Sequence, residues 1–142
     1  MRKAFPTAKS LTLPVLWMVQ EQEGYISEEA MTYVANLLNV PTGHVLGVVT
    51  FYTMFHSKPT GRHHLEVCTN VSCMLRGSTK ILSQLERRLG VTAGQTSADG
   101  KFTLSEVECM GSCGTAPMLA IGEEYHENLT VEKVDQLLDS LK

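Results

Sequence analysis

The first 55 residues repeat apolar side chains at the three- and four-residue spacing that is typical of helices. This pattern predicts a helix over 9–22, with Pro14 either in its first turn or at a kink, and an end at Gly24. Ser27 is expected to cap a second helix, and Pro41 to occupy the first position of a third. The buried stripe of the second helix is predicted to comprise Met31, Val34, Ala35 and Leu38.

A different pattern begins after Pro59 and Gly61, which break the helical spacing. We therefore predict two domains, an N-terminal helical module over residues 1–57 and a second domain over residues 58–142. Alternating apolar residues in the second domain predict a strand over 63–68, and helical spacing predicts a helix over 71–89.

Residues 91–100 are predicted to form a polar turn that ends at Asp99 and Gly100, and the rest of the chain completes the second domain. A strand from Phe102 is expected to carry a bulge near Ser105, because its apolar positions change phase there. A short strand over 118–121 is expected to pair with a segment containing Tyr125, and Thr130 to cap a final helix. This order predicts a small α/β sandwich of the thioredoxin kind, so the whole chain is predicted to be α+β.

Charge and composition exclude some functions. The net charge of −3 provides no basic surface for nucleic acid. No segment approaches the roughly 18 apolar residues of a membrane span, and the start lacks the apolar core of a signal peptide. We therefore expect a cytoplasmic chain that does not insert directly into a membrane.

All four cysteines lie in the second domain. Cys68 and Cys73 are separated by four residues, Cys109 and Cys113 by three, and the two pairs by thirty-five. Cytoplasmic thiols stay reduced, so ligation of a metal is favoured over two structural disulfides. Thiolates favour iron–sulfur clusters, zinc or copper(I). Structural zinc usually has two residues between paired cysteines, and neither pair here has that spacing.

Other motifs accompany the cysteines at fixed positions. They include Gly47-Val48-Val49-Thr50-Phe51-Tyr52-Thr53-Met54-Phe55, Cys73-Met74-Leu75-Arg76-Gly77, and Glu106-Val107-Glu108-Cys109-Met110-Gly111. With them, the chain resembles the small thioredoxin-like iron–sulfur subunit of NADH dehydrogenases, which is the 24 kDa subunit of respiratory complex I and the E subunit of the bacterial enzyme. The resemblance implies a thioredoxin-like [2Fe–2S] ferredoxin domain in which Cys68 and Cys73 hold one iron and Cys109 and Cys113 the other.

The resemblance also implies a function. The chain has no dinucleotide fingerprint, no Walker loop and no catalytic constellation, so it is expected to have no activity alone. As a subunit of NADH:quinone oxidoreductase, it would exchange single electrons with the FMN of a flavoprotein subunit of the F type, which also binds NADH. A second iron–sulfur subunit is another expected neighbour, in a soluble arm attached to the inner membrane.

Two alternatives remain open from the sequence. The same small subunit could serve an NAD-dependent hydrogenase or formate dehydrogenase. A structural zinc module of thioredoxin-like fold is the alternative from another class.

Residues near the cysteines are expected to tune the site. A helix start near Cys73 would direct backbone N–H groups towards its sulfur. Four small polar neighbours are expected to donate hydrogen bonds to sulfur: Thr69, Ser72, Ser112 and Thr115. Arg76 would favour the reduced cluster, and Glu108 would disfavour it if its side chain faces the cluster.

Overall fold

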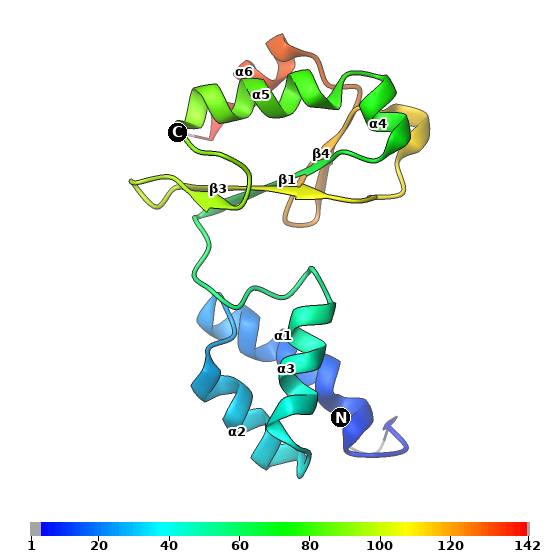
Figure 1. Cartoon of the computed structure of the whole chain (residues 1–142), viewed down its shortest axis with the longest axis vertical. Coiled ribbons are helices and arrows are strands. Elements are labelled where there is room, and N and C mark those ends of the chain that lie inside the picture. Colours follow the sequence, from blue (N-terminus) through cyan, green and yellow to red (C-terminus); the bar gives the residue numbers. More distant parts are fainter. Residues whose placement is uncertain (1–3, 142) are drawn as a thin grey trace. The chain divides into compact units, whose positions relative to one another are not determined.

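The computed structural model describes residues 4–141 and divides into two compact units, Met1–Pro59 and Thr60–Lys142 (Figure 1). The second unit begins two residues after the start that the sequence predicts for the second domain. Each unit has its own apolar core. No helix of the described part of the chain is long and apolar enough to cross a membrane.

The first unit is helical. Its elements are the 3₁₀ turn η2 (Lys9–Leu11) and the helices α1 (Thr12–Glu23), α2 (Glu28–Leu38) and α3 (Thr42–Phe51). Pro14 lies in the first turn of α1, where its missing N–H has no helical partner to lose. Gly24 ends α1 with a left-handed φ of 80°, as the sequence predicts.

Local signals define the next two helices. The Ser27 hydroxyl accepts a hydrogen bond of 3.1 Å from the Ala30 N–H, so Ser27 caps α2 as predicted. The predicted apolar stripe of α2 is buried in full. Pro41 precedes α3 with an extended backbone, φ −62° and ψ 141°, so this helix begins one residue later than predicted.

The core of the first unit lies between these three helices. Leu16, Ile26, Val34 and Val45 are inaccessible to solvent. Trp17 and Phe55 extend this core with an edge-to-face ring contact at 5.6 Å between centroids. The packing therefore joins the start of the unit to its end.

The second unit contains a five-stranded sheet in the order β2-β3-β1-β4-β5. The strands are β1 (His63–Cys68), β2 (Gln95–Thr96), β3 (Phe102–Val107), β4 (Leu119–Ile121) and β5 (Glu124–His126). Strands β1 and β3 are parallel, and the other pairs are antiparallel. The sequence predicts β1 at these bounds and the β4–β5 hairpin with Tyr125, which pairs with Ala120.

Helices α5 (Ser78–Leu89) and α6 (Val131–Ser140) cover one face of this sheet (Figure 1). Ile81 and Leu85 of α5 and Val134 and Leu138 of α6 are buried in the same core as Leu65 of β1. Thr130 caps α6 by accepting a hydrogen bond of 3.3 Å from the Lys133 N–H. The result is a two-layer α+β unit.

Three predictions for the second unit are wrong in detail. The helix over 71–89 is two helices, α4 (Val71–Leu75) and α5, because Gly77 adopts a left-handed φ of 98° between them. Strand β3 has no bulge at Ser105, since it pairs residue for residue with β1. The predicted polar turn over 91–100 contains the short strand β2.

Gly61 packs against the backbone at the start of β3. A Cβ atom there would lie 2.7 Å from the carbonyl carbon of Phe102 and 2.8 Å from its nitrogen. The Gly61 N–H also donates a hydrogen bond of 2.6 Å to the Thr103 hydroxyl. A side chain at this position would push the entry to β1 away from β3.

We therefore expect Gly61→Ala to destabilise the second unit by about 1–3 kcal/mol. For a unit of this size, each kcal/mol lowers Tm by roughly 4–8 °C. Gly47→Ala is the control, because nothing lies within 4 Å of a Cβ at that site in α3 and alanine favours helix. Thermal unfolding followed by circular dichroism measures both, and an unchanged Tm for Gly61→Ala would contradict the steric account.

Candidate metal centre

The topology brings the four cysteines to one end of the sheet. Cys68 ends β1 and pairs with Val107, which ends the parallel strand β3 two residues before Cys109. Cys73 lies in α4, and Cys113 begins the 3₁₀ turn η3 (Cys113–Thr115). The Cys68 thiol donates to the Glu108 carbonyl at 3.9 Å, next to Cys109. Loops that are far apart in sequence thus meet at the carboxyl ends of two paired strands.

The two cysteine pairs differ in burial. Cys68 and Cys73 are 4% and 2% exposed and pack against Ala116 and Met118. Cys109 and Cys113 are exposed. All four are free thiols. The site therefore has an apolar inner side and an open outer side.

Electrostatic interactions link three of the thiols. Burial, hydrogen bonding with Cys68 and the charges of Cys68 and Cys113 raise the pKa of Cys73 to about 11, against a lowering by the Met118 backbone. The backbone group that favours the Cys73 thiolate is thus that of Met118, before β4. The contribution expected from the start of the cysteine's own helix stays a prediction.

The loop from Cys109 to Cys113 turns at Gly111. The Gly111 N–H donates to the Cys109 sulfur at 3.4 Å, so one backbone dipole points at this thiol. Gly111 has a φ of 77°, a left-handed conformation that strongly favours glycine, and open space surrounds the position of a Cβ atom. The turn directs the chain back to Cys113.

Arg76 connects the two cysteine segments. Its Nη1 donates a hydrogen bond of 3.3 Å to the Gly114 carbonyl. Arg76 is the residue at which α4 ends, so the break before α5 places this cation beside the loop of Cys113. The sequence predicts a basic group near the site at this position.

Glu127, just after β5, is a residue that the sequence analysis missed. Its Oε1 accepts hydrogen bonds from the hydroxyls of Ser112 and Thr115, which lie on either side of Cys113. These bonds, that of Ser112 first, lower the pKa of the Glu127 carboxyl. In this structure the hydroxyls of Ser112 and Thr115 thus bond to Glu127, and their predicted hydrogen bonds to sulfur stay a prediction. Only the tertiary fold reveals the contact, since fifteen residues separate Ser112 from Glu127.

The donor set fits an iron–sulfur cluster. Among the described residues, no three His, Cys, Asp or Glu side chains gather as the ligands of a single metal ion would. A [2Fe–2S] cluster has another requirement, two thiolates at each of two irons. The chain offers two pairs of thiols at one end of a sheet, with backbone N–H groups and an arginine beside them.

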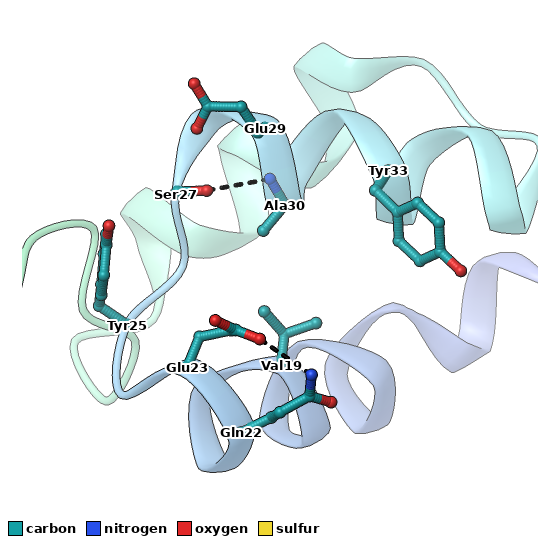
Figure 2. Close-up of a pocket in the computed structure, with 8 residues that line it drawn as sticks. All are labelled: Val19, Gln22, Glu23, Tyr25, Ser27, Glu29, Ala30 and Tyr33. Carbon is teal, nitrogen blue, oxygen red and sulfur yellow. Dashed lines mark hydrogen bonds between the residues drawn. The ribbon is translucent and has the colours of Figure 1, made fainter.

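A pocket in the first unit has different chemistry (Figure 2). It lies between α1 and α2 and has a volume of about 350 Å³. Val19 and Ala30 form its apolar part, and Glu23, Glu29 and Tyr33 are polar residues along it. Among the described residues that line it there is no cysteine, histidine, lysine or arginine, so these residues offer neither thiolate ligands for iron nor positive charge for a nucleotide phosphate.

Comparison with known proteins places the chain in a family. The sequence model of the thioredoxin-like [2Fe–2S] ferredoxin family matches residues 1–142. The chain belongs to this family. Family membership agrees with the resemblance that the motifs show and with the α+β fold.

Similar members of the family come from bacteria. The chain is 44% identical over 138 residues to the E 2 subunit of NADH-quinone oxidoreductase from Rhizobium meliloti, covering 97% of this chain and 82% of that protein. It is 44% identical over 135 residues to the E subunit of NADH-quinone oxidoreductase from Rickettsia conorii, covering 94% and 81%.

A solved structure has the same fold. In an NAD⁺-reducing [NiFe]-hydrogenase in the air-oxidised state, one chain superposes with a TM-score of 0.77 at 19% identity. The match covers 89% of this chain and 22% of the hydrogenase chain. At this identity, the likeness shows the fold alone.

The difference in burial predicts two classes of thiol in the reduced, cluster-free protein. Cys109 and Cys113 should react rapidly with a chromogenic disulfide reagent, whereas burial and the raised pKa of Cys73 should slow Cys68 and Cys73. Cys109→Ser/Cys113→Ser should abolish the fast phase, and the control Cys68→Ser/Cys73→Ser should retain it. If all four thiols of the folded protein react at the same rate, the division into buried and exposed thiols is contradicted.

Proposed function

We propose that this chain is an electron-transfer subunit of an NADH:quinone oxidoreductase. It carries a [2Fe–2S] cluster on Cys68, Cys73, Cys109 and Cys113 and exchanges single electrons with the FMN of a partner flavoprotein. The observation that carries the proposal is the meeting of both cysteine pairs at one end of the sheet. The names of similar proteins support this choice of host complex, since two relatives at 44% identity are named as E subunits of NADH-quinone oxidoreductase.

The assignment of ligands follows the two pairs. Cys68 and Cys73 are buried in the same small cluster, which suits two thiolates on one iron. Cys109 and Cys113 would hold the second iron, with the Gly111 N–H directed at the Cys109 sulfur. When bound, the cluster supplies one-electron oxidation and reduction. The protein holds the thiolates in place and excludes water from their inner side.

The outer side of the site suits approach by a partner. Cys109 and Cys113 are exposed there. Helix α4, which carries Cys73, exposes three apolar side chains, with Val71 at 57%, Met74 at 52% and Leu75 at 78%. Their spacing of three and four residues puts them on one face of the helix, and exposed apolar patches of this kind are typical of interaction surfaces. A flavoprotein that covers this region would bring its flavin near the exposed pair of ligands.

The partner must supply what this chain lacks. The sequence contains no dinucleotide fingerprint, so NADH oxidation belongs to the flavoprotein. A second iron–sulfur subunit of the complex would be the next neighbour, in a soluble arm at the inner membrane. The hydrogenase likeness is one of fold alone, so the quinone oxidoreductase remains the preferred host.

Each ligand variant tests the cluster assignment. Wild-type protein prepared without oxygen should contain about two irons and two acid-labile sulfides per chain. Cys68→Ser, Cys73→Ser, Cys109→Ser and Cys113→Ser should each reduce this content and the visible absorption, because each removes one thiolate. Metal analysis with sulfide determination measures this, and stoichiometric zinc without sulfide would establish the zinc alternative instead.

Electron exchange is tested with and without the partner. The isolated chain should not oxidise NADH, and its cluster should stay oxidised when NADH is added. With the flavoprotein present, NADH should reduce the cluster, which EPR detects through the signal of the reduced state. Chain carrying Cys68→Ser/Cys73→Ser is the control for signal from the partner alone. NADH oxidation by the isolated chain would overturn the role as a carrier.

A further inference from the structure

Glu127 holds both flanks of the exposed cysteine Cys113. Its Oε1 accepts from Ser112 Oγ and, at 2.5 Å, from Thr115 Oγ1. The adjacent backbone reinforces the contact, because the Asn128 N–H donates to the Thr115 carbonyl at 2.7 Å. The segment after β5 therefore fixes the loop that carries Cys113 through side chain and backbone together.

The network uses both hydroxyl protons of the loop. Ser112 Oγ and Thr115 Oγ1 also lie 2.6 Å apart, so either hydroxyl is able to donate to the other. The Thr115 hydroxyl further contacts the Ser112 carbonyl at 3.2 Å. Each hydroxyl has one proton to donate. In these contacts each proton goes to the Glu127 carboxylate, to the other hydroxyl or to the Ser112 carbonyl. Neither proton is then available to the sulfur of Cys113.

Two charged side chains contact the loop of Cys113, the cation Arg76 at Gly114 and the carboxylate of Glu127 at Ser112 and Thr115. None of the described lysine, arginine or histidine side chains forms an ion pair with Glu127. The hydrogen bonds keep the carboxyl ionised by lowering its pKa. A fixed negative charge near a centre that gains an electron opposes that gain.

We propose that Glu127 is a positioning residue that sets the reduction potential of the iron–sulfur site. Its carboxylate anchors the Ser112–Thr115 loop, which carries Cys113. It also keeps two hydroxyl donors from bonding to sulfur and adds negative charge beside the loop. Both electrostatic effects favour the oxidised cluster. The inference rests on the proposed [2Fe–2S] ligation.

Two variants separate charge from anchoring. Glu127→Gln retains an acceptor oxygen and removes the charge, so its midpoint potential in an EPR-monitored redox titration should shift upward. Ser112→Ala/Thr115→Val retains the charge and removes both protons, so its midpoint should not rise. Its loop loses the anchor, so an iron chelator should remove the cluster several times faster than from wild type.

The matched control is Glu123→Gln, which makes the same charge change in the turn between β4 and β5. This turn lies near the start of β1, whereas Cys68 is at the end of β1. Its midpoint should equal that of the wild type. A Glu127→Gln midpoint that equals the wild-type value, or a Glu123→Gln shift as large, would overturn the tuning role. Equal rates of cluster loss for the double variant and wild type would overturn the anchoring role.

The same experiment distinguishes this inference from the proposed function. Wild-type protein that assembles no iron and sulfide refutes both. If the wild type assembles a normal cluster but the variants keep its midpoint potential and its rate of cluster loss, only the role of Glu127 is refuted.

Discussion

The parallel pairing of β1 with β3 is the constraint on which the site depends. Their residue-for-residue register places Cys68 beside Val107, so the chain leaves both strands at the same edge. Backbone hydrogen bonding continues one step beyond the strands, from the Thr69 N–H to the Val107 carbonyl at 3.1 Å. A slip by one residue would turn the side chains of a strand to the opposite face and separate the cysteine loops. The helix-covered core beneath the sheet makes such a slip costly, because it would expose Leu65 and Val67.

The surroundings of the cysteines differ between the inner and outer sides of this sheet edge. The inner thiols rest on apolar groups that continue the fold's interior, as the contacts of Cys68 and Cys73 with Met118 show. The outer thiols depend on short polar segments held by specific hydrogen bonds, in which Gly111 and Arg76 donate and Glu127 accepts. The fold therefore provides burial on one side, whereas individual side chains provide order on the other.

Local signals in the sequence predict most elements, and tertiary contacts explain the failures. The caps Ser27 and Thr130 and the alternation of β1 act within a few residues, so they are readable from the sequence. The change of apolar phase after Ser105 reflects the end of β3 at Val107 and a loop to Cys109, rather than an inserted residue. Glycine alone does not reveal a left-handed conformation, so the sequence does not predict the break at Gly77. The spacing of the four cysteines groups them into two pairs in the sequence itself. The contact of Glu127 with the Cys113 loop depends on the β4–β5 hairpin, so it is not readable from the sequence.

The burial of Cys68 and Cys73 against Ala116 and Met118 has a consequence for the kinetics of the proposed electron transfer. When a centre changes its charge, nearby water and mobile dipoles must reorient, and this reorganisation energy contributes to the activation barrier. Apolar walls on the inner side contain few dipoles that can reorient. On the outer side, the hydroxyls of Ser112 and Thr115 are already fixed by one carboxylate. The inner side therefore responds little to a change of charge, whereas water at the exposed Cys109 and Cys113 has to be displaced by a partner before the outer side does the same. A small response on both sides would favour fast electron exchange in the proposed complex.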